Sequence, residues 1–320
     1  MIGTVRKIAL THQEIQFFNH EGYWVVENLF TDNDLQPVID EISEEVDRRA
    51  RELVGTGELS RPFDECDFET RLARISAETH KVANSIWHGK LSGPEFFHLI
   101  CNPKLLDIAE QLCGPELIAS STYRLRPKVP GHIEGPVPWH QDSGYFQSYC
   151  DKELILTVWL PLVDATCDRG CMWVIPRAHQ GICKHVHRQP LPYLEIPESQ
   201  LPSSKPVCLP MKKGSVLLLT NLTPHASFEN TTEVVRWSMD LRYQNAKLPT
   251  NAKISRLAGE VTESLENGIP AACNPPEADF LVRSRERPNE VVTDPVEFHR
   301  LRKMHPVHKV SRRWPQKESL

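Results

Sequence analysis

The chain has 320 residues, of which 40% are hydrophobic and 25% charged, and its formal net charge is −5. This size allows a substantial core in one large domain or two ordinary ones. The acidic balance argues against a dedicated nucleic-acid-binding protein. No run approaches the roughly 18 apolar residues of a membrane span, and the N-terminus lacks a secretory signal pattern. We therefore expect a cytoplasmic protein that binds neither nucleic acid nor membrane.

Helix signals dominate the N-terminal third. A capping-box pattern beginning at Thr11 predicts a short helix that ends at Gly22, and residues 23–30 follow as a strand. A second box at Thr31 precedes apolar residues three or four apart, which predict a long amphipathic helix. Residues 92–114 indicate a further helical pair.

The pattern changes near residue 117 to short β-rich runs separated by Gly, Pro, Asn and Asp. These runs are LIASSTYRLRP, ELILTVWLPLV, CMWVIP, SVLLLT and EVVRWSMDLRY. They are typical of an antiparallel sandwich or barrel rather than of alternating βαβ units. We predict a single domain over residues 1–320, with a helical flank (1–116), a β-rich core (117–245) and a C-terminal segment packed on that core (246–320).

The segment VPWHQDSGYF contains a candidate pair of metal ligands, His140 and Asp142. The pair is weak by itself, because His132–Glu134 and His185–His187 have the same spacing. In an extended strand, however, residues two apart face the same side, so this imidazole and carboxylate could grip one ion. His225, after the strand SVLLLT, would complete a two-histidine, one-carboxylate set, which suits Fe(II) and leaves coordination positions open.

The run EVVRWSMDLRY alternates strictly between apolar and polar residues. Its polar face consists of Arg236, Ser238, Asp240 and Arg242. That face could line a cavity beside a metal, or it could face solvent. Arg236 favours the cavity, because a guanidinium can hold the carboxylate of a dicarboxylic cofactor through two parallel hydrogen bonds.

Nine cysteines are scattered along the chain without a C-x-x-C pair or zinc-ribbon spacing. We expect free, mostly structural thiols.

Four segments, in this order, resemble the phytanoyl-CoA dioxygenase family of Fe(II)- and 2-oxoglutarate-dependent oxygenases. They are LTHQEIQFFNHEGYWVVENLF, the WHQD segment, LTVWLPLVDATCDRGCMWVIPRAHQG and KKGSVLLLTNLTPHASFENTTEVVRWSMDLRY. The resemblance implies a double-stranded β-helix, a mainly β, cupin-like jelly-roll with helices on its outer face.

The resemblance also implies site residues. His140, Asp142 and His225 match the iron ligands, and are therefore the expected catalytic centre.

Three further positions match the contacts of 2-oxoglutarate. Arg236 would hold its distal carboxylate, Ser227 would share that carboxylate, and Trp159 would pack beside the cofactor. Thr122 and Arg124 have the parity expected of a strand lining the other side of this pocket.

The implied reaction uses 2-oxoglutarate and O2 as co-substrates and releases succinate and CO2. A C–H bond of a small-molecule substrate would be hydroxylated, or oxidised in another way such as desaturation. Related halogenases lack the carboxylate ligand, so the presence of Asp142 argues against halogenation. The alternative is a non-catalytic, metal-binding jelly-roll that acts as a binding or sensor protein, which would have no need of Arg236 and Ser227.

The basic C-terminal segment has two interpretations. It could be a solvated segment held on the barrel by Phe280, Phe298 and Trp314. Alternatively, Arg283 or Arg285 could fold back to select an anionic substrate group. Gln141 and His179 are expected to support the structure rather than the chemistry.

Overall fold

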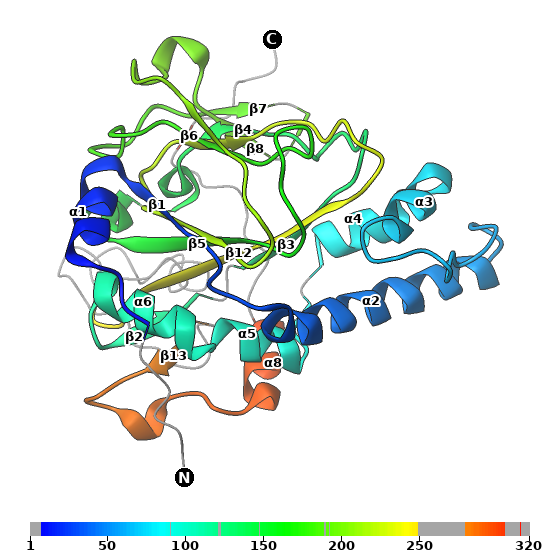
Figure 1. Cartoon of the computed structure of the whole chain (residues 1–320), viewed down its shortest axis with the longest axis horizontal. Helices are drawn as coiled ribbons and strands as arrows, with labels where there is room; N and C mark the ends of the chain where they lie inside the picture. The colour runs from blue at the N-terminus through cyan, green and yellow to red at the C-terminus, as the bar shows by residue number, and fades with distance from the viewer. Residues whose placement is uncertain are drawn as a thin grey trace.

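The computed structural model describes residues 8–89, 91–120, 123–146, 148–188, 190–191, 193–248, 279–304 and 314 (Figure 1). The helices are α1 (His12–Glu21), α2 (Asp32–Gly55), α3 (Arg71–Glu78), α4 (Lys81–Trp87), α5 (Pro94–Ile100), α6 (Pro103–Cys113) and α8 (Pro295–Met304). The strands are β1 (Tyr23–Val26), β2 (Leu117–Ala119), β3 (Arg124–Lys128), β4 (Val137–His140), β5 (Ile155–Pro161), β6 (Met172–Val174), β7 (Val186–Arg188), β8 (Tyr193–Glu195), β9 (Val207–Leu209), β10 (Val216–Leu219), β11 (His225–Ser227), β12 (Arg236–Asn245) and β13 (Phe280–Arg283).

Two antiparallel sheets form the core. The larger has the order β1-β10-β5-β12-β2-β13, with β3 also paired to β12, and the smaller has the order β4-β11-β6-β9. Figure 1 shows β5 and β12 crossing the middle of the molecule, with β4 and β6 above them and α5, α6 and α8 below. The larger sheet therefore lies between a helical layer and the smaller sheet.

Alternate side chains of β12 face the helical layer and the smaller sheet. Trp237, Met239 and Leu241 are buried in the large apolar cluster shared with the helices. The opposite face does not lie open to solvent either, since Arg236 is 2% exposed, Ser238 is fully buried, and Asp240 and Arg242 are half-buried. The solvent-facing interpretation of that polar face is therefore wrong.

Local sequence signals explain the helical flank. Thr11 and Glu14 form the predicted capping box, and α1 ends at Gly22, whose positive φ of 85° is the left-handed conformation that glycine accepts readily. The second box, at Thr31, begins α2. The predicted pair over residues 92–114 is α5 and α6, which ends at Gly114.

The structure differs from the sequence prediction in two strands. The run from residue 117 is divided into β2 and β3, because these strands pair with different parts of β12. The segment after SVLLLT contains a strand that was not predicted, β11, which begins at His225 and pairs with both β4 and β6. Helices α3, α4 and α8 were not anticipated.

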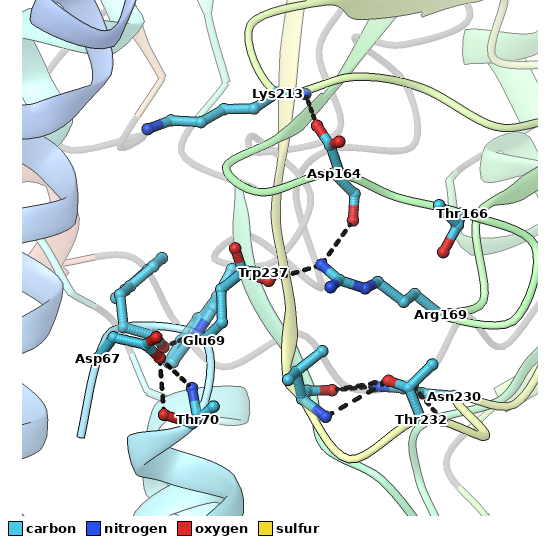
Figure 2. A network of polar contacts seen from close by, with 12 residues as sticks. Asp67, Glu69, Thr70, Asp164, Thr166, Arg169, Lys213, Asn230, Thr232 and Trp237 are labelled. Carbon is cyan, nitrogen blue, oxygen red and sulfur yellow. Dashed lines mark hydrogen bonds and ion pairs between the residues drawn. The ribbon is translucent and has the colours of Figure 1, made fainter.

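A polar network joins the helical flank to the loops of the core. Figure 2 shows Arg169 between the backbone carbonyl of Asp164 and the side chain of Glu69, to which its guanidinium donates at 3.3 and 2.6 Å. Nearby, the Trp237 indole donates to the carbonyl of Phe68. These contacts fix the turn at residues 166–171, which borders the candidate site.

Candidate metal centre

The structure brings together the three predicted metal ligands. His140 ends β4, Asp142 follows in the 3-10 turn η1 (Asp142–Tyr145), and His225 lies opposite His140 on β11. Asp142 Oδ1 is 4.0 Å from Nε2 of each histidine, and all three side chains are buried. Two imidazoles and a carboxylate within this space can hold one Fe(II) on one side.

Backbone carbonyls orient the two imidazoles. His140 Nδ1 lies 2.8 Å from the carbonyl of Pro138, and His225 Nδ1 lies 2.9 Å from that of Thr223. Because a carbonyl only accepts, each Nδ1 carries the proton and each Nε2 presents its lone pair to the centre. Burial, with the neighbouring His225, lowers the pKa of His140 to about 3, so the ring is neutral, as a ligand must be.

Two residues to which the sequence gave no individual role hold Asp142, and one of them, Arg242, belongs to the predicted polar face. Thr157 Oγ1 donates to Asp142 Oδ2 at 2.6 Å, and Arg242 Nη2 donates to Oδ1 at 2.9 Å. Burial alone would raise the pKa of Asp142, but Arg242 and the two histidines hold it below its ordinary value. Strand parity could have found both, since Thr157 is two residues from Trp159 and Arg242 shares the face of Arg236.

The predicted anion-binding arginine lies on the same face of β12. Arg236 donates to the hydroxyls of Ser227, at 3.2 Å, and Ser238, and its guanidinium lies 5.3 Å from the ring of Trp159. Its buried Nε has no hydrogen-bond partner, and no described carboxylate forms an ion pair with it. Burial lowers the pKa of Arg236 to about 10. This guanidinium therefore fits an anion that comes from outside the described chain.

A second cation, Lys128 of β3, lies directly opposite Arg236 and was missed in the sequence. Its Nζ donates to the carbonyl of Ser227 at 2.8 Å, to the Ser227 hydroxyl at 2.6 Å and to the carbonyl of Phe228. Burial, with Arg236 beside it, holds the pKa of Lys128 well below its ordinary value. We call Lys128, Ser227 and Arg236 the cationic cradle. Of the two residues predicted on the other side of the pocket, Thr122 lies outside the described residues, and Arg124 lies on β3 opposite Asp240.

Gln141 has the supporting role expected of it. Its side-chain amide donates to the carbonyls of Gly181 and Leu222, and its side-chain oxygen accepts from the backbone of Cys183. These bonds hold the loops that contain Gly181 and Leu222 next to the end of β4, where His140 lies. His185 is buried and accepts a bond from the Gln141 backbone at 3.0 Å.

The other candidates lie elsewhere. His132 bonds Asn84 at 2.7 Å, and Glu134 pairs with His88, so the competing His-x-Glu motif forms no metal clip. His179 bonds the carbonyl of Asn19, as expected of a structural residue.

The two tail arginines also lie apart from the centre. Arg283 pairs with Asp107 and Glu110 of α6, and Arg285 pairs with Glu110. Both arginines are therefore bound to the helical layer, on the side of the larger sheet away from the metal ligands.

The described cysteines are free, as expected, but three of them converge. Cys167, Cys171 and Cys208 have their sulfur atoms within 4.8 Å of one another. The turn before β6 and the register of β6 with β9 bring them together, which sequence spacing could not reveal.

Comparison with known proteins identifies one family. The family model described as "Phytanoyl-CoA dioxygenase (PhyH)" matches residues 18–238. A phytanoyl-CoA dioxygenase of Arabidopsis thaliana is 26% identical, over 75% of this chain and 96% of the relative. The peroxisomal phytanoyl-CoA dioxygenase of Rattus norvegicus is 25% identical, over 81% of this chain and 78% of the relative.

Solved structures share the fold. The epimerase SnoN, determined in complex with Fe3+, alpha ketoglutarate and nogalamycin RO, superposes with a TM-score of 0.54 at 20% identity, over 85% of this chain and 98% of SnoN. The predicted mainly β jelly-roll with flanking helices is confirmed by this likeness and by the two antiparallel sheets.

Proposed function

Since the chain belongs to the phytanoyl-CoA dioxygenase family of Fe(II)- and 2-oxoglutarate-dependent oxygenases, we propose that His140, Asp142 and His225 hold its iron. The protein is an enzyme of that class, which oxidises a C–H bond and releases succinate and CO2. When bound, Fe(II) and 2-oxoglutarate supply the oxidising chemistry, and the chain supplies binding, orientation and shielding from water.

Contacts within the protein orient all three proposed metal ligands. Backbone carbonyls fix both imidazole rings, while Thr157 and Arg242 fix the carboxylate. Such outer contacts raise ligand basicity and prevent rotation away from the ion. Because Asp142 fills the carboxylate position, the arrangement favours hydroxylation or desaturation over halogenation.

The cationic cradle is our proposed site for the distal carboxylate of 2-oxoglutarate. The observation that carries this assignment is the burial of Arg236. Its Nε has no hydrogen-bond partner, and no carboxylate of the described residues forms an ion pair with its guanidinium. An isolated buried cation is costly unless an anion compensates it. Trp159 would pack beside the bound cofactor, and Thr122 stays a prediction. A metal-binding sensor protein would have no use for such a cradle.

Anaerobic titration tests the proposal. Adding Fe(II) and then 2-oxoglutarate should produce the visible metal-to-ligand charge-transfer band of the chelate, and admission of air should yield succinate. Absence of the band together with absence of succinate would leave the non-catalytic jelly-roll as the better interpretation.

We propose one domain over residues 1–320, a small-molecule substrate, no nucleic-acid partner and a cytoplasmic location. None of the described helices is both long and apolar enough to cross a membrane. Fractionation of cells tests the location, since several relatives are named as peroxisomal.

A further inference from the structure

The polar face of β12 extends across its neighbouring strands. Residues directly opposite one another in an antiparallel pair lie on the same face of the sheet. The cross-strand pairs are Arg236 with Lys128, Ser238 with Arg126, Asp240 with Arg124, and Arg242 with Thr157. Because Arg242 contacts Asp142, this shared face is the one that meets the metal centre.

Positive charge exceeds negative charge on this face. It carries Arg124, Arg126, Lys128, Arg236 and Arg242 against the single carboxylate of Asp240. Asp142 balances Arg242, and the cradle is assigned to 2-oxoglutarate. The charges of Fe(II) and the 2-oxoglutarate dianion cancel each other, so an excess of positive charge survives when both are bound.

Arg124 has few hydrogen-bond partners among the described residues. It donates to the carbonyl of Tyr123 at 3.2 Å, and it forms no ion pair with any described carboxylate. Arg302 of α8 donates to the same carbonyl at 3.4 Å and stacks on the Tyr123 ring. Burial, followed by the neighbouring arginines, lowers the pKa of Arg124 to about 9.

Arg126 is poised beside Arg124. Its guanidinium stacks on Trp87 at 4.6 Å and reaches Asp240 only at 3.5 Å, a long contact for an ion pair. Both arginines are partly exposed, so a ligand can reach them. A planar guanidinium binds an oxyanion through parallel hydrogen bonds, and two adjacent guanidinia discriminate strongly for an anion.

We propose that Arg124 and Arg126 bind the anionic group of the primary substrate, which is a carboxylate or a phosphate ester. The proposal rests on the proposed function, because it takes the metal centre as the place of reaction. Asp240, opposite Arg124, and Arg242, the Asp142 partner, are two residues apart, a separation of about 7 Å along a strand. The oxidised carbon therefore lies several bonds from the anionic group.

Substrate-dependent succinate release tests this site. A panel of organic acids and phosphate monoesters, each paired with its neutral methyl or dimethyl ester, is assayed with Fe(II) and saturating 2-oxoglutarate. We expect stimulation by charged members and not by their neutral esters. The two arms of the panel distinguish a carboxylate from a phosphate ester.

Substitutions of Arg124 test whether this stimulation depends on the proposed site. Losing a charge-assisted hydrogen bond weakens binding about tenfold or more. Arg124→Gln should therefore raise the KM of the stimulating anion at least tenfold, and Arg124→Lys should raise it less. The KM of the co-substrate 2-oxoglutarate should stay within about twofold in both variants. Arg283→Gln, on the helical layer, is the matched control and should change neither constant.

A direct binding measurement tests the site even if no compound of the panel is a substrate. Acetate and methylphosphonate are titrated calorimetrically into anaerobic enzyme that carries Fe(II) and 2-oxoglutarate, and one of them should show a saturable site that Arg124→Gln weakens. Stimulation by neutral esters, or anion binding that is absent or unaffected by Arg124→Gln, would overturn the proposal. A missing charge-transfer band would instead overturn the proposed function itself.

A second and independent site lies at the three converging thiols. Cys208 Sγ is 2.8 Å from Cys167 Sγ and 3.3 Å from Cys171 Sγ. Cys171 is fully buried, whereas Cys167 is exposed, so an ion has access from one side. Tetrahedral zinc at about 2.3 Å from each sulfur needs the sulfurs about 3.8 Å apart, which requires them to separate by about an ångström or less.

We propose that Cys167, Cys171 and Cys208 bind a soft d10 cation, Zn2+ in the first place, with a water molecule as fourth ligand. Burial, followed by the neighbouring thiols, raises the pKa of Cys171, so this thiol is a poor nucleophile until a metal displaces its proton. The ion would fix the turn whose Gly170 carbonyl accepts the Ser227 hydroxyl bond at 2.9 Å. It would thus stiffen the wall behind the cationic cradle.

Co2+ is the probe that separates this site from the iron site, because only thiolate ligands give a strong sulfur-to-cobalt charge-transfer absorption. We expect the band in the reduced full-length protein and in His140→Ala, its loss in Cys171→Ser, and its displacement by Zn2+. Cys66→Ser, away from the cluster, should retain it.

Two results would overturn the thiol site. One is absence of the band from the reduced protein, or its persistence in Cys171→Ser. The other is an intact mass about 2 Da lower that dithiothreitol restores, which would mean that Cys167 and Cys208 form a disulfide instead.

Discussion

The two ends of the polar sheet face differ in how their cations are held. At the cradle end, Lys128 has three oxygen acceptors, and Arg236 donates to two hydroxyls. All of these acceptors are uncharged, so they fix the cations without neutralising them. At the other end, Arg124 has one carbonyl and Arg126 one distant carboxylate.

This difference indicates two kinds of ligand. A preorganised cradle suits a co-substrate that binds in the same way in every turnover, because the cost of ordering its donors is met during folding. The looser outer end suits a substrate whose anion completes the coordination of the arginines. The metal ligands lie next to Arg242, which follows Asp240 by two residues on β12, beyond the outer end.

Removing the carboxylate ligand of the metal should have the largest effect, because the proposed roles of both ends of the polar face depend on the metal. Asp142→Ala deletes one of three iron ligands and leaves Arg242 without its carboxylate. We expect iron-dependent succinate formation to be abolished, as measured by succinate release in air. Glu134→Ala, which alters the competing His-x-Glu motif, should retain activity, and equal losses in both variants would contradict the ligand assignment.

Changing the cradle should separate its role from that of the outer end. Arg236→Leu removes the charged partner of the distal carboxylate, which contributes about 2–3 kcal/mol, or roughly a hundredfold in the KM of the co-substrate. Initial rates over a range of 2-oxoglutarate concentrations measure it. Arg285→Leu, on the helical layer, is the control, and a normal KM in Arg236→Leu would contradict the cradle.

A smaller effect should follow from loosening the carboxylate ligand. Thr157→Val keeps the shape of the side chain but removes the hydroxyl that bonds Asp142 at 2.6 Å. Contacts of this kind are worth about 10- to 100-fold in metal affinity, and Arg242 still holds the carboxylate, so we expect the lower value, about tenfold. Anaerobic Fe(II) titration measures it. Unchanged affinity would show that Arg242 alone suffices.

The sequence predicted what depends on local spacing. The alternation of β12 places Arg236 correctly, because strand periodicity acts within one segment. His140 and Asp142 converge as predicted, although Asp142 lies in η1, two residues after the end of β4. Capping patterns likewise located α1 and α2.

The missed residues depend on contacts between distant segments. Lys128 became visible only through the register of β3 against β12. The three thiols meet because β9 pairs with β6, far along the chain. Register is set by the packing of whole sheets rather than by neighbouring residues, so single-sequence patterns carry little information about it.

The smallest effect that we expect concerns the hydroxyls of the cradle. Ser227 accepts bonds from Lys128 and Arg236 and donates to Gly170, whereas Ser238 bonds Arg236 alone among the cradle residues. Ser227→Ala should raise the KM of the co-substrate about fivefold, near 1 kcal/mol, because Lys128 keeps its two carbonyl acceptors. Ser238→Ala, the matched variant, should change it by less than about twofold. Equal changes of this KM in the two variants would mean that Ser227 only positions Arg236. A larger change in Ser227→Ala is expected if the Ser227 hydroxyl also contacts the distal carboxylate of 2-oxoglutarate.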